Sequence, residues 1–250
     1  MTHPQKVIAV TGASRGIGAA IARELAARGH LIGCLTRKGI GIEEGETDPT
    51  IADRLIPIAC DVTDAEQGAS ALAELAQRGG RLDGLINNAG LHMEGRSIEF
   101  PVEDFARVLQ VNATAVFALC QRVQPHLVEA GGGIIVNIGS HYDKMGVKYT
   151  AAYCASKAAV GAITRCLAVE WARHGIRVVD VAPGFILTDL NREHMKDERV
   201  RNFIEHAIPA RQVGSPEEIA RFVAAIYGED IPFMTGETYY IDGAQAIANI

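Results

Sequence analysis

"KVIAVTGASRGIG", residues 6–18, joins a short apolar run to a glycine-rich turn and to the start of a helical pattern. Gly12, Gly16 and Gly18 let the chain turn tightly and let its backbone approach an anion. Free N–H groups and the helix dipole favour negative charge at that helix end. The stretch differs from GxGxxG and lacks the Lys-Ser/Thr ending of a P-loop. A strand before it and a helix after it predict a dinucleotide site rather than a turn without a ligand.

The rest of the chain repeats this change from apolar runs to helical patterns. The apolar runs are 6–11, 31–36, 55–60, 82–87, 133–139, 176–182 and 238–242, and the helical patterns are about 16–28, 66–78, 112–129, the helix that carries Tyr153, and about 216–227. Continuous apolar strands separated by helices indicate a parallel sheet that is buried on both faces. We predict an α/β fold with a Rossmann-type, doubly wound parallel sheet of about seven strands, in a single domain over residues 1–250.

Two segments interrupt the alternation, residues 37–54 and residues 185–212. Long excursions inside a compact domain are often functional, and the second follows a strand at the edge where such sheets bind ligands. We predict a substrate lid at 185–212. A solvated surface helix is an equally open interpretation of the charged part of this segment.

Composition excludes several classes of protein. The chain is 48% hydrophobic and 22% charged, with a net charge of −6 and no concentrated block of Lys and Arg. This pattern argues against a nucleic-acid partner. No run approaches the roughly 18 apolar residues of a membrane span, so we expect a cytoplasmic protein with no membrane partner. The eight histidines and five cysteines form no metal-ligand spacing and no CxxC pair, so no metal is predicted.

The choice of cofactor depends on the end of the second predicted strand. An NAD site usually has an acidic residue there, about 20 residues beyond the glycine loop, which holds the ribose 2′-OH. This chain has "LTRKG", with Arg37 and Lys38, and Arg15 adds a third cation. Because these cations would stabilise a 2′-phosphate, we predict NADP(H). The alternative is that Arg37 and Lys38 merely open a solvated loop.

Seven motifs in order resemble those of the short-chain dehydrogenase/reductase family. They are "TGASRGIG" (11–18), "CDVTD" (60–64), "NNAG" (87–90), "VNAT" (111–114), "NIGS" (137–140), "YCASK" (153–157) and "APGFILTDL" (182–190). Within that family the chain is most similar to the 3-oxoacyl-[acyl-carrier-protein] reductases. The resemblance covers nearly the whole chain and implies the residues of the site.

The family pattern implies a catalytic set of Asn112, Ser140, Tyr153 and Lys157. Tyr153 would pass its phenolic proton to a carbonyl oxygen as hydride reaches the carbon, and Lys157, one helical turn away, would favour the phenolate. Ser140 would orient the substrate oxygen, and Asn112 would position a water that connects Lys157 to solvent. The implied cofactor-binding residues are Gly12, Ser14, Arg15, Gly16, Ile17, Gly18, Arg37, Asp61, Val62, Asn88, Ala89, Gly90, Tyr153, Lys157, Pro183, Gly184, Ile186 and Thr188.

The resemblance implies NADPH-dependent reduction of a ketone or 3-oxoacyl group to a secondary alcohol. The substrate would be a small molecule or an acyl thioester, and the protein a homo-oligomer, most simply a tetramer. Oxidation of a secondary alcohol or a sugar-type polyol remains an alternative, as does a non-catalytic sensor of NADP. Lys144 and Lys148 offer some charge for an acidic acyl carrier. Residues expected to line the substrate pocket are His141, Tyr142, Met145, Tyr149, Leu187 and Leu190, although each could equally pack between loop and lid.

Overall fold

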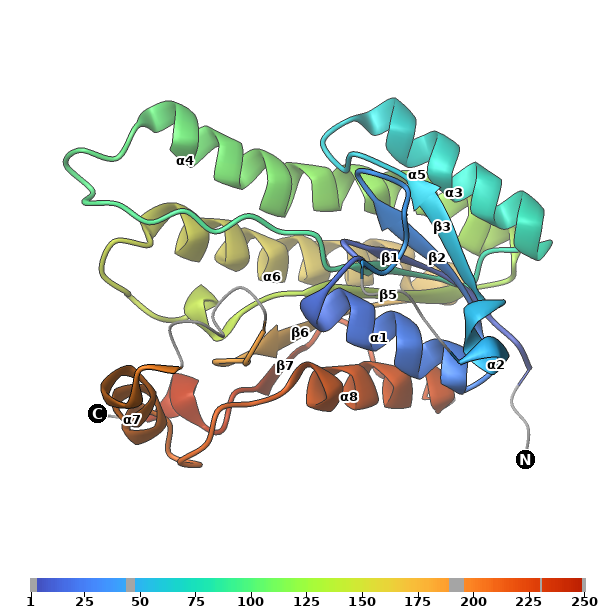
Figure 1. Ribbon diagram of the computed structural model, residues 1–250. Coiled ribbons are helices and arrows are strands. Elements are labelled where there is room, and N and C mark those ends of the chain that lie inside the picture. Colours follow the sequence, from blue (N-terminus) through green and yellow to red (C-terminus); the bar gives the residue numbers. More distant parts are fainter. Residues whose placement is uncertain (1–3, 44–47, 189–195, 230, 249–250) are drawn as a thin grey trace.

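The computed structural model describes residues 4–43, 48–188, 196–229 and 231–248. Its centre is a seven-stranded parallel sheet in the order β3-β2-β1-β4-β5-β6-β7 (Figure 1). The strands are β1 (Val7–Thr11), β2 (Leu31–Thr36), β3 (Leu55–Ala59), β4 (Gly84–Asn87), β5 (Gly133–Ile138), β6 (Ile176–Pro183) and β7 (Thr238–Ile241). The predicted fold class is confirmed. The order reverses between β1 and β4, and such a reversal creates a crevice at the carboxyl ends of the strands.

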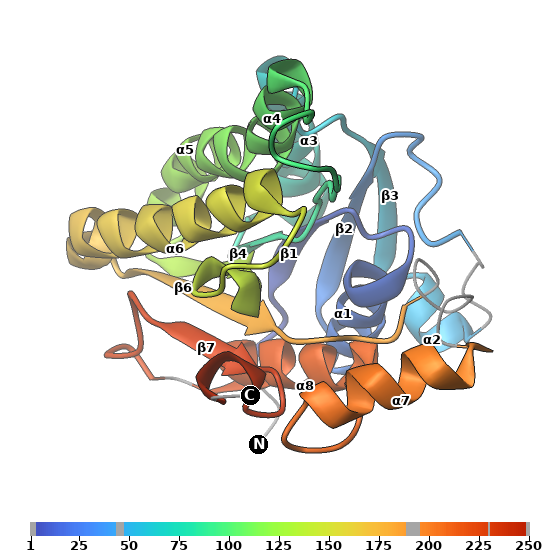
Figure 2. The same ribbon diagram turned by 90° about the vertical axis from the view of Figure 1, so that its left-hand side faces the viewer.

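Helices cover both faces of this sheet. They are α1 (Gly16–Ala27), α2 (Pro49–Ala52), α3 (Ala65–Gly79), α4 (Val102–Leu109), α5 (Ala115–Glu129), α6 (Ala151–Trp171), α7 (Glu198–Ala207) and α8 (Pro216–Gly228). Figures 1 and 2 show α1 and α8 on one face and α3, α5 and α6 on the other. Figure 2 views the carboxyl ends of the strands, and α7 lies on that side.

Strand β1 shows why the strands read as continuous apolar runs. Ile8 and Val10 belong to the core beneath α1 and α8, whereas Val7 and Ala9 belong to the core beneath α3, α5 and α6. Successive side chains of a strand point to opposite faces, so a sheet covered twice needs apolar residues at every position.

The helix predicted from about residue 112 begins earlier and is not uniform. It starts at Val102 as α4 and continues through a π-helical segment, Gln110–Thr114, into α5. Within α4 only Val108 is buried, yet Val102, Phe105 and Leu109 follow a helical spacing, so the prediction missed a signal that the sequence carries. The wider turn of the π segment also breaks the 3.6-residue period on which the prediction depended.

Both excursions contain short helices. Residues 37–54 include α2, and residues 185–212 include α7, which agrees with the surface-helix interpretation of that segment. Residues 189–195 of the proposed lid lie outside the described part of the chain. An isolated bridge pairs Ile186, near the start of the excursion, with Gly214, just beyond its end.

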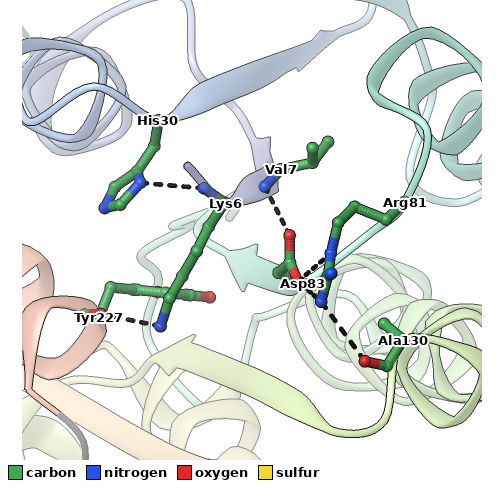
Figure 3. A network of polar contacts seen from close by, with 7 residues as sticks. All are labelled: Lys6, Val7, His30, Arg81, Asp83, Ala130 and Tyr227. Atoms are coloured by element: carbon green, nitrogen blue, oxygen red, sulfur yellow. Dashed lines mark hydrogen bonds and ion pairs between the residues drawn. The ribbon is translucent and has the colours of Figure 1, made fainter. Parts of the chain in front are cut away.

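A polar network ties the starts of the strands together (Figure 3). Asp83 accepts a hydrogen bond of 2.8 Å from the Val7 backbone N–H and another of 2.7 Å from Arg81 Nε. Lys6 Nζ donates to the Tyr227 carbonyl of α8 at 3.0 Å. These contacts satisfy polar groups at the edge of the sheet opposite to the crevice.

Candidate active site

Two adjoining cavities of about 400 and 510 Å³ lie at the carboxyl ends of the strands. Predicted residues that line the first are Arg15, Gly16, Ile17, Asn88, Gly90, Ser140, Tyr153, Lys157, Pro183, Gly184, Ile186 and Thr188. Those that line the second are Gly12, Ser14, Arg15, Arg37, Asp61, Val62, Asn88, Ala89 and Gly90. The fold therefore brings together nearly all of the predicted site, with Gly18 and Asn112 as the exceptions.

The glycine loop has the backbone that its sequence predicts. Gly12 and Gly16 have φ angles of +64° and +56°, which favour glycine. Gly18 lines neither cavity; a Cβ atom there would lie 2.3 Å from the Gly12 carbonyl oxygen, so its role is to let α1 approach the loop. The first turn of α1 contains no acidic residue, and the Arg15 side chain makes no capping hydrogen bond. The positive end of α1 thus fits a pyrophosphate.

The loop after β4 fastens the glycine loop in place. Asn88 Nδ2 donates to the carbonyl oxygens of Thr11 and Gly12 at 3.0 and 3.1 Å. Thr11 Oγ1 accepts from the backbone N–H groups of Asn88 and Ala89 at 2.9 and 3.0 Å. Asparagine suits this position because its amide N–H groups can bridge two carbonyls.

The second cavity has the polar groups that an adenosine ribose needs. Arg37 and Asp61 both line it, whereas the neighbouring Lys38 is exposed and does not line it. Hydrogen bonds from Thr63 lower the pKa of Asp61, and the charge of Arg37 adds a smaller effect. Thr36 Oγ1 is buried and has no hydrogen-bond partner in the described part of the chain. A ligand hydroxyl could donate to the Asp61 carboxylate, and a phosphate could accept from Arg37 and the Thr36 hydroxyl.

Ser140, Tyr153 and Lys157 converge in the first cavity. Lys157 is 5% exposed; its Nζ donates to the Ile138 carbonyl at 2.7 Å and lies 5.6 Å from the centre of the Tyr153 ring. The Ser140 hydroxyl accepts a hydrogen bond of 3.2 Å from the Tyr142 N–H, which orients it at the start of the 3₁₀ helix His141–Asp143, labelled η2.

The charge state of Tyr153 differs from the expectation that Lys157 favours its phenolate. Burial raises the pKa of Tyr153 above its usual 10, and hydrogen bonding by Ser140 opposes this only in part. Lys157 was expected to lower the pKa of Tyr153, but the protein without a cofactor raises it. Burial lowers the pKa of Lys157 itself to about 8, opposed by the charge of Asp180. At neutral pH the phenol is protonated and the ammonium is charged.

Asn112 is buried and lines neither cavity, although it contacts Leu91, which lines both. Its Oδ1 accepts from the Leu91 N–H at 2.7 Å, and its Nδ2 donates to the Leu91 carbonyl at 2.8 Å and to Ser156 Oγ at 3.0 Å. The side chain thus satisfies backbone groups, but of the loop after β4 rather than of a helix start. Its predicted water-positioning role stays a prediction, and π segments such as the one that contains it are frequent at functional sites.

The walls of the first cavity agree only in part with the expected substrate pocket. His141 and Tyr142 line it, whereas Met145, Tyr149 and Leu187 are not among its lining residues and Leu190 lies outside the described residues. The additional lining residues are Leu91, His92, Ile138, Gly139 and Phe185. His92 could have been predicted to line the cavity only from its position, five residues after Asn87 at the end of β4.

Asp180 is a second residue that the sequence interpretation missed. It is fully buried in β6, and its carboxylate is the charge that acts on Lys157. An acidic residue inside the apolar run "IRVVDVA" was the available signal, because buried carboxylates are rare unless they have a partner.

Two further properties concern the described part of the chain as a whole. None of its helices combines the length and the apolar character that crossing a membrane requires. Its His, Cys, Asp and Glu side chains form no group of three or more that could hold a metal ion.

A Rossmann-type sheet, a glycine loop at a helix start, and Ser, Tyr and Lys side chains at the carboxyl edge define a class of nucleotide-binding oxidoreductases. A family model described as enoyl-(acyl carrier protein) reductase matches residues 12–244. The chain belongs to the short-chain dehydrogenase/reductase family, whose members act on hydroxyl and keto groups with nicotinamide cofactors.

Relatives within this family carry different names. The chain is 35% identical to 3β-hydroxysteroid dehydrogenase 1 of Eggerthella lenta, over 97% of this chain and 94% of that protein. It is also 35% identical to a 3-oxoacyl-[acyl-carrier-protein] reductase of Vibrio cholerae, over 95% and 96%. The crystal structure of acetoin dehydrogenase from Salmonella typhimurium superposes with a TM-score of 0.86 at 34% identity, over 98% of each chain.

Proposed function

We propose that the protein reduces a ketone to a secondary alcohol with NADPH, with Tyr153 as the proton donor. The observation that carries this proposal is that Tyr153 shares one cavity with Ser140 and Lys157. Burial raises the pKa of its phenol above the usual 10, so the hydroxyl is protonated at neutral pH. A protonated acid at neutral pH suits the reductive direction.

The chain's own residues account for the movement of the proton. Bound NADPH supplies the hydride that reaches the carbonyl carbon. Tyr153 Oη gives its proton to the carbonyl oxygen as negative charge develops there, and Ser140 Oγ holds that oxygen by a hydrogen bond. The phenolate that remains is stabilised by the Lys157 ammonium, which lies one helical turn along α6. One hydride and one proton convert the C=O group into CH–OH.

The proposed preference for NADPH rests on the second cavity. Arg37 and Arg15 line its wall, and β2 ends without an acidic residue that could hold a ribose 2′-OH. A guanidinium is well suited to a phosphate because it can donate two parallel hydrogen bonds.

The substrate proposed is an uncharged ketone of medium size. His92 and Tyr142 form an aromatic wall beside Tyr153, with ring centres 4.5 and 6.0 Å from the Tyr153 ring. Docking of an acidic acyl carrier has less support, because Lys144 points its ammonium at the Tyr240 ring, 3.8 Å from its centre. A 3-oxoacyl thioester is therefore the second candidate, suggested by the name of the Vibrio relative.

A panel of ketones and 3-oxoacyl thioesters, assayed with NADPH and with NADH, tests the proposal. Tyr153→Phe should lower the rate of reduction by about 10²- to 10⁴-fold, because it removes the proton donor. Tyr149→Phe is the matched control: Tyr149 is 55% exposed and lines neither cavity, so its variant should keep the wild-type rate.

Three outcomes would contradict parts of the proposal. Turnover that survives in Tyr153→Phe would exclude the proton-transfer step. Faster oxidation of secondary alcohols or polyols than reduction of any ketone would favour the dehydrogenase direction. Binding of NADPH without turnover of any carbonyl or alcohol would favour a sensor.

We also propose a homo-oligomer. The family resemblance supports this proposal, and the exposed apolar side chains Phe117 and Val128 on α5 and Val169 on α6 are candidates for the interface. Sedimentation velocity should give a mass of about four chains of 26.7 kDa. A monomer at micromolar concentration would contradict this proposal.

A further inference from the structure

Asp180 is a buried acidic residue in the middle of the sheet. It is 0% exposed and lies in β6, opposite Asn137 of β5 and Thr238 of β7. A carboxylate in such a place costs free energy unless hydrogen bonds or an opposite charge offset its desolvation.

Hydrogen bonds offset that cost only in part. Thr238 Oγ1 donates to Asp180 Oδ2 at 3.2 Å, but Oδ1 has no hydrogen-bond partner in the described part of the chain. Oδ1 instead lies against Gly139, where an added Cβ atom would be only 2.5 Å from it. Gly139 directly follows Ile138, whose carbonyl binds the Lys157 ammonium at 2.7 Å. The two buried charged side chains therefore lie against neighbouring residues, Ile138 and Gly139, of one backbone.

The charged and titratable groups around Asp180 come from three elements. Lys157 of α6 stabilises its ionised form, whereas Asp143 of η2 opposes it. Tyr240 of β7 donates a hydrogen bond of 2.7 Å to Asp143, and Arg165 of α6 acts on that tyrosine. Lys157 and Asp180 thus each influence the pKa of the other.

Burial and mutual attraction set the charge state of this pair. Burial raises the pKa of Asp180 to about 6 and lowers that of Lys157 to about 8, and each charge opposes the change in the other. Between about pH 6 and 8 both groups are ionised. Because they interact, they titrate as a pair rather than as independent sites.

We propose that Asp180 is a positioning residue for the reaction, and that its buried carboxylate keeps the Lys157 ammonium charged and seated at the Ile138 carbonyl. The catalytic part of this inference rests on the proposed function. Loss of the carboxylate charge makes deprotonation of Lys157 easier, since a negative charge nearby disfavours it. The alkaline limit of activity should therefore move to lower pH.

The pH profile of kcat/KM for ketone reduction, at saturating NADPH, tests the catalytic part. Asp180→Asn keeps the shape of the side chain and removes its charge, so its alkaline limb should lie about one pH unit below that of the wild type. Thr238→Val is the matched control, because it removes the hydrogen bond to Asp180 but keeps the carboxylate; its alkaline limb should stay in place. Equal loss of activity at every pH in Asp180→Asn, with an unmoved limb, would overturn the proposal.

A second measurement needs no turnover. Urea unfolding of the cofactor-free protein at pH 7 and fixed protein concentration is compared for wild type, Asp180→Asn, Lys157→Met and the double variant. Asp180→Asn should lower the unfolding midpoint when Lys157 is present and raise it when Lys157 is replaced, because an unpaired buried carboxylate is itself unfavourable. Additive effects would overturn the pairing of the two residues. Coupling without any turnover would instead refute the proposed function alone.

Discussion

The imidazole of His92 lies beside the phenol of Tyr153, with ring centres 4.5 Å apart and planes inclined by 55°. His92 comes from the loop after β4, whereas Tyr153 is in the first turns of α6. Burial lowers the pKa of His92, opposed by Glu94, whose carboxylate lies 3.6 Å from Nε2. The ring forms part of the wall of the first cavity, into which the proposed substrate would bind.

Replacement of His92 by Ala should mainly weaken substrate binding. An aromatic contact contributes about 0.5–1.5 kcal/mol, so KM for the ketone should rise about two- to twelvefold while kcat changes less. Glu94→Gln keeps the wall and removes the nearby charge, and its KM should match the wild type. A loss of kcat in His92→Ala as large as that in Tyr153→Phe would mean that the imidazole takes part in proton transfer.

Arg37 should decide between the two nicotinamide cofactors. Arg37→Ala removes a charge-assisted contact to a 2′-phosphate, so KM for NADPH should rise about tenfold or more, while KM for NADH stays nearly constant. Lys38→Ala, one residue along and outside the cavity, is the control. If the two variants raise KM for NADPH equally, the overall charge of the loop explains the preference for NADPH and a specific contact of Arg37 does not.

The rate of reduction should fall as the pH rises above about 8. Lys157 has a pKa of about 8, below its usual 10.5, so its ammonium is present below that pH and is lost above it. Lys157→Arg carries a cation that does not titrate in this range, and its residual activity should show no decline near pH 8. A wild-type profile that stays flat to pH 10 would contradict the assignment of this limb to Lys157.

Gly18→Ala should disturb the cofactor loop. The new methyl group would lie 2.3 Å from the Gly12 carbonyl oxygen and 2.4 Å from Asn88 Nδ2, where these two groups now form a hydrogen bond. We expect a loss of about 1–3 kcal/mol in the free energy of unfolding and weaker NADPH binding, measured by urea unfolding and fluorescence titration. Gly228→Ala at the end of α8, where the nearest atom is 3.7 Å away, should change neither.

Tyr227→Phe tests the packing of α8 on the sheet. The buried hydroxyl of Tyr227 donates to the Ile134 carbonyl at 2.9 Å. Its removal should lower the free energy of unfolding by about 1–2 kcal/mol without changing KM. An unchanged unfolding midpoint would show that the hydrogen bond adds no net stability. Tyr149→Phe, at an exposed side chain, should stay within about 0.5 kcal/mol of the wild type.

The sequence by itself determined the sheet, the glycine loop and the alignment of Tyr153 with Lys157. These features are local: every strand buried on both faces must be apolar throughout, glycine is needed where φ is positive, and residues four apart share a helix face. The same reasoning failed at the start of this helix: the apolar spacing of α4 was missed, and the π segment after it breaks the period.

Only the tertiary structure decided which distant side chains surround that pair. The charge of Asp180 acts on Lys157 from β6, and His92 packs against Tyr153 from the loop after β4. Asn112 bonds to Leu91 and lines neither cavity. The burial that raises the pKa of Tyr153 and lowers that of Lys157 is likewise a product of packing. Contacts between segments far apart in the chain leave no periodic pattern, and the desolvation of a charge depends on every element that surrounds it.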